Sequence, residues 1–289
     1  MRRSLVAALI CGVLAVGLHA QDKRYSVRGM VLRVDPATRT FTVSHEAIDG
    51  LMSAMIMPFE VRDARDLALL APGALVDFTL VIGAQAGYAT DILVRKYQTA
   101  EQDPLTARRL ALLKKAAGRS VPALAAGQQV PDFTLTDQTG QPVRFSEISA
   151  GKVVAVDFVY TRCALPQFCL RASNVFSVMQ RRFTRQYSRD LVLLTVTFDP
   201  ERDTPEVLAS YAARFNADPK MWRFLTGKTA DVRRVCTLFG VESYLDEGLL
   251  NHSLHTVVID RRGRLVANVE GNQYTPEQLG DLILETLMR

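Results

Sequence analysis

Two cysteines that could act as nucleophiles or metal ligands lie close together in the segment Tyr160-Thr161-Arg162-Cys163-Ala164-Leu165-Pro166-Gln167-Phe168-Cys169. The segment follows the continuous apolar run Val153–Phe158 and precedes a stretch that we expect to be helical. The unpaired N–H groups and the positive dipole end of a helix N-terminus favour thiolate over thiol. A thiolate is both a redox nucleophile and a soft metal ligand. Cys163 and Cys169 therefore predict disulfide exchange or binding of a soft ion such as Cu(I), with a structural disulfide as the alternative.

A second candidate site is rich in methionine. Met52, Met55 and Met57 are three of the eight methionines of the chain and fall within six residues. Met55 and Met57 are two apart in an expected strand, so both should point to one face, and His45 ends the preceding strand. Thioethers with an imidazole form a soft, neutral site that prefers Cu(I) or Ag(I). Core packing is the alternative interpretation, because methionine commonly fills apolar interiors.

The first 20 residues have the pattern of a secretory signal peptide. Arg2 and Arg3 form a basic start, Leu5 to Leu18 an apolar run, and Ala20 a small residue before cleavage. The apolar run is shorter than the ~20 residues that a membrane-spanning helix needs. We therefore expect export to the bacterial periplasm, with an uncleaved anchor in the inner membrane as the alternative.

Export changes how the cysteines are interpreted. Of the four cysteines, Cys11 would leave with the signal peptide, which leaves Cys163, Cys169 and Cys236 in an oxidising compartment. This odd number argues against a framework of structural disulfides. Cys236 lies in an apolar pattern with Val235, which favours a buried core thiol.

Length and charge set further bounds. A chain of 289 residues predicts two domains. The formal charge of +5 falls to +3 without Arg2 and Arg3, and no basic run interleaves with aromatic residues. The sequence therefore gives no support for nucleic-acid binding.

The methionine cluster falls in a β-rich region that we place at residues 21–98. Five β-branched runs are separated by turn residues: Tyr25–Val34, Thr40–Ser44, Met55–Val61, Ala74–Ile82 and Tyr88–Val94. Five short strands without a strong helix indicate a small closed, OB-like barrel, because closure removes exposed sheet edges. An Ala/Leu/Lys/Arg-rich stretch follows, and we interpret residues 99–122 as a helical linker.

The paired cysteines fall in a region of alternating strands and helices at residues 123–289. Val153–Phe158 and Leu191–Thr197 are continuous apolar runs, as expected for central buried strands. Helices are predicted after Cys169, from Thr204-Pro205, around Asp231–Phe239 and from Thr275. This order indicates an α/β fold with one central sheet.

Residues 123–289 resemble the SCO/SenC family of copper chaperones for cytochrome oxidase. Besides the cysteine loop, the resemblance rests on Thr197-Phe198-Asp199-Pro200-Glu201-Arg202-Asp203-Thr204-Pro205, Trp222-Arg223-Phe224-Leu225-Thr226-Gly227 and Asn251-His252-Ser253. It implies a thioredoxin-like fold in which Cys163, Cys169 and His252 bind copper, as Cu(I) or also as Cu(II). It further implies a supporting role for Asp199 near the metal loop.

The chain departs from the commonest pattern of that family. Five residues separate Cys163 from Cys169 instead of three, and Ala164 and Leu170 replace the prolines that usually accompany the longer spacing. His255 does not match the ligand position. Loop strain and thiol pKa both set redox poise, so copper delivery to an oxidase is a weaker expectation than copper binding.

Residues 25–96 resemble the periplasmic CusF-type copper-binding domain. The match is carried by His45-Glu46-Ala47-Ile48 through Met55-Ile56-Met57-Pro58-Phe59. In that family one histidine and two methionines bind the metal, and a tryptophan covers it. By this resemblance His45, Met55 and Met57 are ligands, and Met52 stands at the tryptophan position as a fourth soft ligand or as an apolar cap.

Together these features predict a metallochaperone that captures Cu(I) and passes it to a partner such as the copper subunit of a terminal oxidase. Tethering two copper sites would make transfer a local event at high effective concentration. The alternative is a thiol–disulfide oxidoreductase that reduces the cysteines of a partner, with Cys163 as attacking thiolate. A peroxiredoxin-like peroxidase is disfavoured, because the segment before Cys163 lacks the peroxidatic Pro-x-x-x-Thr/Ser-x-x-Cys arrangement.

Overall fold

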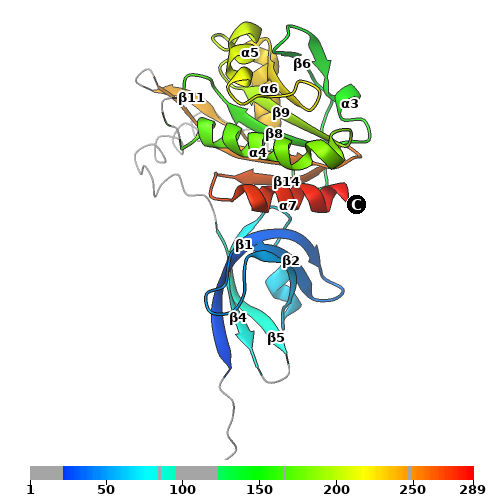
Figure 1. The fold of residues 1–289 in the computed structure, drawn as a ribbon, viewed down its shortest axis with the longest axis vertical. Helices are drawn as coiled ribbons and strands as arrows, with labels where there is room; N and C mark the ends of the chain where they lie inside the picture. Colours follow the sequence, from blue (N-terminus) through cyan, green and yellow to red (C-terminus); the bar gives the residue numbers. More distant parts are fainter. Residues whose placement is uncertain (1–21, 84–85, 96–122, 164, 166, 247–248) are drawn as a thin grey trace, which may run out of the picture.

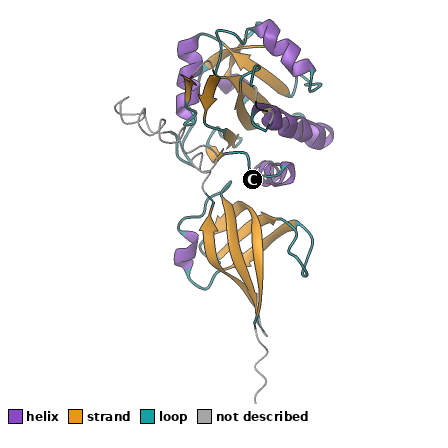
Figure 2. Cartoon of the chain, turned by 90° about the vertical axis from the view of Figure 1, so that its left-hand side faces the viewer, coloured by secondary structure: helices purple, strands orange, loops and turns teal. Residues whose placement is uncertain are grey.

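A computed structural model describes residues 22–83, 86–95, 123–163, 165, 167–246 and 249–289. The described chain forms two main sheets (Figures 1 and 2). The first is built from the N-terminal strands; the second is built from the C-terminal region, which also contains the long helices. The expected signal peptide (1–20) and helical linker (99–122) lie outside the described residues. These segments, and the domain boundaries beside them, stay predictions.

The first sheet contains the five strands expected from the sequence, in the antiparallel order β3-β2-β1-β4-β5. They span Lys23–Asp35 (β1), Thr40–His45 (β2), Met55–Glu60 (β3), Leu75–Ile82 (β4) and Gly87–Val94 (β5), with a short 3-10 helix, η1, at Ala64–Leu67. Three phenylalanines from β2, β3 and β4 meet in the core, with ring centroids of Phe59 and Phe78 4.8 Å apart and of Phe41 and Phe78 5.3 Å apart.

The closed, OB-like barrel expected for this region is not shown. The ladder has two ends, β3 and β5, so the sheet is open. Among the described residues, a single parallel bridge between Val61 and Ala89 joins these ends. The chain leaves the strand direction after Val61 and enters η1, whose Leu67 is buried in the core. Between β3 and β5, the core is therefore covered by side-chain packing and not by a ladder of backbone hydrogen bonds.

The second sheet has seven strands in the order β14-β13-β8-β9-β10-β6-β7. Its strands are Thr134–Asp137 (β6), Pro142–Arg144 (β7), Val153–Val159 (β8), Leu191–Thr197 (β9), Trp222–Thr226 (β10), His255–Ile259 (β13) and Leu265–Glu270 (β14); a separate hairpin pairs Ser243–Asp246 (β11) with Leu249–His252 (β12). The helices are Phe145–Ile148 (α3), Cys169–Tyr187 (α4), Pro205–Ala213 (α5), Thr229–Leu238 (α6) and Pro276–Leu287 (α7).

The centre of this sheet follows from its apolar strands. Every residue of β8 and of β9 is buried, and the two strands pair in parallel. Parallel strands buried on both faces are expected to be mostly apolar, and these two are apolar apart from Asp157, Thr195 and Thr197. The crossover from β8 to β9 runs through α4, which packs against both strands. This strand–turn–helix order places Cys163 and Cys169 at the carboxyl end of the central strand.

Two helices begin where the sequence predicts, because side chains cap their first N–H groups. The Thr204 hydroxyl accepts from Val207 N at the start of α5, with Pro205 in the first turn. Thr275 and Gln278 form a reciprocal capping box at the start of α7.

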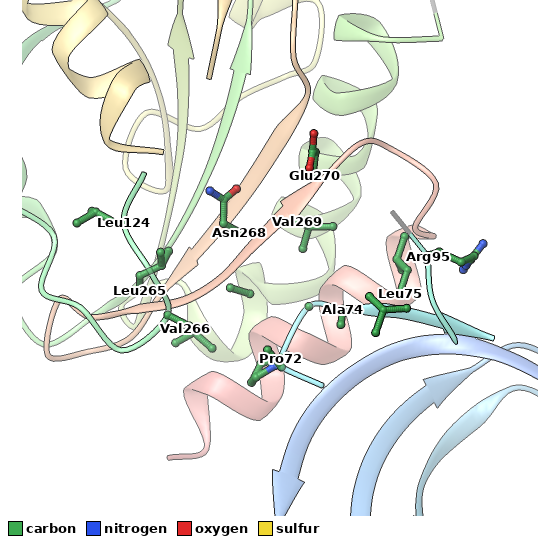
Figure 3. Close-up of a pocket in the computed structure, with 15 residues that line it drawn as sticks. Pro72, Ala74, Leu75, Arg95, Leu124, Leu265, Val266, Asn268, Val269 and Glu270 are labelled. Atoms are coloured by element: carbon green, nitrogen blue, oxygen red, sulfur yellow. The ribbon is translucent and has the colours of Figure 1, made fainter. Parts of the chain in front are cut away.

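The two sheets meet through α7. This helix contacts β1 and β2 (Figure 1). Three side chains of the first sheet, Met30, Leu32 and Leu75, join the core of the second. Nearby, Gly73 has φ +85° and lies against β14; a Cβ there would come within 2.7 Å of the Ala267 Cβ. A cavity of about 290 Å³ beside this contact is lined by β14 and by the residues that lead into β4. Figure 3 draws the residues that line it.

Candidate metal centre

Three soft donors converge beside the carboxyl end of β8. Cys163 lies in the turn after β8, Cys169 is the first residue of α4, and His252 ends β12. Their donor atoms all lie within 4.8 Å of one another. The Cys169 Sγ is 3.7 Å from the His252 Nε2. The structure thus brings together the three residues that the sequence places up to 89 positions apart.

The orientation of His252 is held from its other ring nitrogen. Nδ1 lies 3.0 Å from the carbonyl oxygen of Ser253, which accepts a hydrogen bond from the Nδ1–H. In this tautomer Nε2 carries a lone pair, and that lone pair faces Cys169. The imidazole also packs against two aromatic rings, with centroid distances of 4.4 Å to Phe198 and 5.8 Å to Tyr160. This contact predefines the ring position before any ligand arrives.

The two thiols are chemically unequal. Cys169 is buried, whereas Cys163 is partly exposed. The contact with the Cys169 thiol lowers the pKa of Cys163. The same contact and burial raise the pKa of Cys169. Cys163 is therefore the more acidic of the two thiols, and Cys169 keeps its proton to higher pH.

A buried aspartate anchors the start of the cysteine loop. Asp203, fully buried, accepts from Thr161 N at 3.1 Å and from Thr161 Oγ1 and Thr197 Oγ1 at 2.6 Å each. Asp203 lies in the motif Thr197–Pro205, but the sequence did not predict that it anchors the cysteine loop. Asp199, the predicted supporting residue, accepts from Arg162 at 3.1 Å and from Arg202 at 3.3 Å. It therefore contacts the residue before Cys163.

A second clamp holds the other end of the loop. Asn272 Nδ2 donates to the Gln167 carbonyl at 2.5 Å, and Arg171 donates to the carbonyls of Asn272 and Tyr274 at 3.0 Å each. These residues lie just before α7, more than 100 positions after the loop. No local sequence signal marks them, because each interaction uses a main-chain carbonyl that any residue supplies.

Beneath the thiols lies a carboxyl group without an ion-pair partner among the described residues. Asp157 in β8 is completely buried, and neither carboxylate oxygen has a hydrogen-bond partner in the described part of the chain. Burial raises its pKa to about 7. The signal was present in the sequence, since Asp157 is the single charged residue in an otherwise apolar strand.

The first sheet aligns the predicted histidine and methionines on one face. His45 lies opposite Met55 and Val43 lies opposite Met57 in the β2–β3 ladder, so these side chains share a face. His45 is 2 % exposed; its Nδ1 lies 2.6 Å from the Glu46 carbonyl, and its Nε2 has no partner in the described chain. Met55 is 48 % exposed. Met52 and Met57 pack against the first core, and Met52 forms a bridge with Ile48.

The remaining candidates lie outside both clusters. Cys236 in α6 is a buried thiol whose pKa burial raises to about 12. His255 begins β13, and its Nδ1 contacts Asn268 Oδ1 at 2.9 Å. Within the described ranges, no helix is both long and apolar enough to cross a membrane.

Two family models match separate parts of the chain. The model SCO1/SenC matches residues 122–287, and the model "copper binding periplasmic protein CusF" matches residues 24–93. The first covers more than half of the chain, including all three converging donors.

Individual relatives align with the same C-terminal region. The SCO2-like protein of Rickettsia typhi is 29% identical over 143 residues, 46% of this chain and 66% of that protein. The protein sco1 of Schizosaccharomyces pombe is 27% identical over 159 residues, 52% of this chain and 58% of that protein. The alignments thus span about two thirds or less of these relatives.

A solved structure shares the fold. A SCO1/SenC family lipoprotein from Bacillus anthracis superposes with a TM-score of 0.50 at 22% identity, covering 55% of this chain and 95% of that one. The expected thioredoxin-like α/β fold of the second region is confirmed by the family match and this similarity.

Proposed function

The chain belongs to the SCO1/SenC family, and on this premise we propose that it is an exported copper metallochaperone. Cys163, Cys169 and His252 hold Cu(I) as cargo and release it to a recipient protein. The observation that carries the proposal is the convergence of two sulfurs and one imidazole nitrogen within 4.8 Å. Two thiolates and an imidazole suit a soft monovalent ion better than a hard one.

The surroundings of the three donors fit such a cargo. Cu(I) binds both sulfurs as thiolates, and the raised pKa of Cys169 means that binding must displace its proton. The buried side of the site, formed by Cys169 and the rings of Phe198 and Tyr160, excludes water. The partly exposed Cys163 leaves one side on which a recipient ligand can approach.

The first sheet offers a second site of different chemistry, formed by His45, Met55 and Met57 with Met52 beside them. The strongest support is the His45 Nε2, a buried acceptor with no partner among the described residues, since buried polar atoms are nearly always satisfied. The Nδ1 contact with the Glu46 carbonyl directs the free lone pair to Nε2. The match of residues 24–93 to a copper-binding family supports this site.

A Cu(I) titration of the reduced protein against a competing chelator tests both sites. We expect two equivalents for the wild type. Cys163→Ser/Cys169→Ser should lose one equivalent and Met55→Leu/Met57→Leu the other. Binding that neither double variant reduces would contradict the proposal.

The proposed recipient is the copper subunit of a terminal oxidase, the partner that the SCO/SenC resemblance implies, and the proposed location is the periplasm. Transfer can be measured directly by mixing the loaded protein with a reduced recipient domain and separating the two. We expect copper to move to the recipient. Retention of copper by the loaded protein would contradict this choice of partner.

Thiol–disulfide exchange is the second candidate function, favoured by the unequal thiols. The Cys163 thiolate would attack a partner disulfide and form a mixed disulfide; the Cys169 sulfur would then attack Cys163, releasing the reduced partner and leaving the pair oxidised. The partner gains two electrons in this sequence; one of its two protons comes from the Cys169 thiol and the other from solvent.

His252 discriminates between the two functions, because copper binding uses its lone pair and disulfide exchange does not. His252→Ala should weaken Cu(I) binding at the second site by more than the roughly 10- to 100-fold that loss of an outer-shell partner costs. Disulfide reduction should stay largely intact. His255→Ala is the matched control and should leave both readouts unchanged. Equal loss of copper binding and disulfide reduction in His252→Ala would contradict this division of roles.

A further inference from the structure

Several turns meet at the end of the second sheet that lies opposite the cysteine loop. The cysteine loop follows the carboxyl end of β8, and the seven residues of this strand, a rise of about 20 Å, separate it from the amino end. At the amino end, Arg261 in the turn between β13 and β14 donates to the carbonyls of Gly151 and Leu287 and to the Asp190 carboxylate. It thereby joins the turns that precede β8 and β9 to the end of α7. Figure 1 shows that end of α7, marked C, and the β11 hairpin on opposite sides of this region.

The charged residues on and beside these turns are mostly basic, and we call them the amino-end face. They are Arg33, Lys152, Arg189, Asp190, Asp260, Arg261, Arg262, Arg264, Glu285 and Arg289. Seven are basic and three are acidic, which is an excess of four positive charges. The whole chain without Arg2 and Arg3 has a formal charge of only +3. The positive charge of the exported chain is therefore concentrated at this end of the fold.

The three acidic residues of the face are already engaged within it. Asp190 and Glu285 each pair with an arginine of the face, at 2.9 and 3.0 Å. The Asp260 carboxylate accepts from two main-chain N–H groups of its own turn, at 2.8 and 2.9 Å. Four cationic side chains have no acidic partner among the described residues: Lys152, Arg189, Arg262 and Arg264. These cations are available to an external anion.

Helix ends account for only part of this pattern. Cations stabilise the C-terminus of a helix, which explains Arg189 just after α4 and Arg289 just after α7. Arg262 and Arg264 lie between two strands, β13 and β14, and follow no helix. Their presence beside the other cations therefore needs another explanation.

The composition of the face fits a lipid surface better than a protein partner. The cores of protein interfaces are depleted of charged residues, whereas here Met288, 73 % exposed, is a large apolar side chain set among cations. The cations come from separate turns, and a bilayer presents its phosphates as a plane that several turns can reach at once. Arg261, Arg262 and Arg289 also line a cavity of about 300 Å³, which leaves room for a headgroup phosphate.

We propose that the amino-end face binds the surface of an anionic phospholipid bilayer. Its arginines donate hydrogen bonds to the headgroup phosphates, a geometry that guanidinium groups suit, and Met288 enters the region between the headgroups. The cysteine loop then lies on the side away from the lipid, where a recipient protein can reach Cys163. This binding goes beyond the copper sites proposed above and does not depend on them.

The test uses residues 21–289, the chain expected after export, which contains every described residue. Its partition coefficient is measured by co-sedimentation with vesicles of phosphatidylcholine alone and of equal amounts of phosphatidylcholine and phosphatidylglycerol, at low and at high ionic strength. The variant is Arg189→Gln/Arg262→Gln. The matched control, Lys228→Gln/Arg233→Gln, removes two positive charges at α6, outside the face. All four side chains are exposed, so neither variant disturbs the core.

We expect the parent protein to bind the anionic vesicles at low ionic strength, to be released by salt, and not to bind the phosphatidylcholine vesicles. Arg189→Gln/Arg262→Gln should lower the partition coefficient about 10- to 30-fold, whereas Lys228→Gln/Arg233→Gln should behave as the parent. Equal losses in the two double variants would assign the binding to net charge and overturn the proposal. Absence of binding to the anionic vesicles, or equal binding to both kinds of vesicle, would overturn it as well.

Met288→Ser and poly-glutamate distinguish a bilayer from an acidic protein. Met288→Ser should lower the partition coefficient on anionic vesicles about 3- to 10-fold, because the variant loses an apolar contact with the lipid, and should leave binding to poly-glutamate unchanged. Tighter binding of the parent protein to poly-glutamate than to vesicles of equal charge concentration would overturn the lipid assignment in favour of an acidic protein.

Discussion

The two candidate sites differ in how completely their own region prepares them. Cys163, Cys169 and His252 come from three segments of one fold, and the cysteine loop is clamped at both ends, by Asp203 and by Asn272. In the first sheet, His45 and Met55 are paired across two neighbouring strands. Packing and supporting hydrogen bonds that lock side chains hold a site in one geometry, so we expect the cysteine–histidine site to be the more rigid of the two.

The difference suits a transfer pathway. Neutral thioethers release a soft ion more readily than thiolates do. Methionines, unlike cysteines, cannot be blocked by disulfide formation. The second site, by contrast, couples metal binding to a proton and to the redox state of two cysteines. The following predictions ask whether this rigidity resides in particular residues of the second region.

The largest expected effect comes from Asp203→Ala. The substitution leaves the three donors that Asp203 satisfies, Thr161 N and the hydroxyls of Thr161 and Thr197, without their acceptor. Unsatisfied buried donors cost about 1–3 kcal/mol each, and we expect a total loss of about 3 kcal/mol in the free energy of unfolding. Chemical denaturation measures this loss, and Cu(I) affinity at the second site should fall with it.

The control for that prediction is Glu60→Ala in the first sheet. Its ion pair with Arg39, at 3.8 Å, is half exposed at both ends, so the change should stay within about 0.5 kcal/mol. Similar losses in Asp203→Ala and Glu60→Ala would contradict the view that the second site is the more tightly built.

Asp157→Asn should have an intermediate effect that depends on pH. The usual pKa of 3.8 is raised to about 7 in the folded protein, mainly by burial. Below the usual value the carboxyl is neutral in both states; between the two values only the unfolded chain ionises, so stability falls as pH rises. Asparagine does not ionise, so the variant does not lose stability in this way. The free energy of unfolding of Asp157→Asn, relative to that of the wild type, should therefore increase by roughly 2 kcal/mol from pH 5 to pH 7.

Thermal or chemical unfolding of both proteins at several pH values provides the measurement. A difference between Asp157→Asn and wild type that stays constant over this range would show that the carboxyl is ionised in the folded protein throughout.

The smallest effect is expected from Asn272→Ala. The variant removes one hydrogen bond to the Gln167 carbonyl, which contributes about 1 kcal/mol. We expect at most a roughly 10-fold loss of Cu(I) affinity at the second site and no change at the first. The exposed neighbour Gln273 supplies the control substitution to alanine. Identical titration curves for the two variants would show that the Asn272–Gln167 hydrogen bond does not contribute to Cu(I) binding.

Local patterns in the sequence were sufficient for much of the fold. Five strands in the first region, the buried strands β8 and β9, and the capped starts of α5 and α7 were all predicted. Each depends on side-chain periodicity or on a cap within a few residues, so short segments carry the information. The closure of the first sheet was not predictable in this way, because it depends on whether β3 and β5 meet, and no local pattern reports the distance between the ends of a sheet.

The sequence by itself determined which residues carry soft donor atoms and which segments are strands or helices, because donor type and periodicity are properties of single residues and near neighbours. Only the tertiary structure decided that Cys163, Cys169 and His252 converge, that Asp203 and Asn272 hold the loop between them, and that α7 docks against β1 and β2 with Ser44 bonded to Asp281. These contacts join residues from 40 to more than 200 positions apart. Their geometry follows from the packing of two sheets and the helices between them, which no local segment encodes.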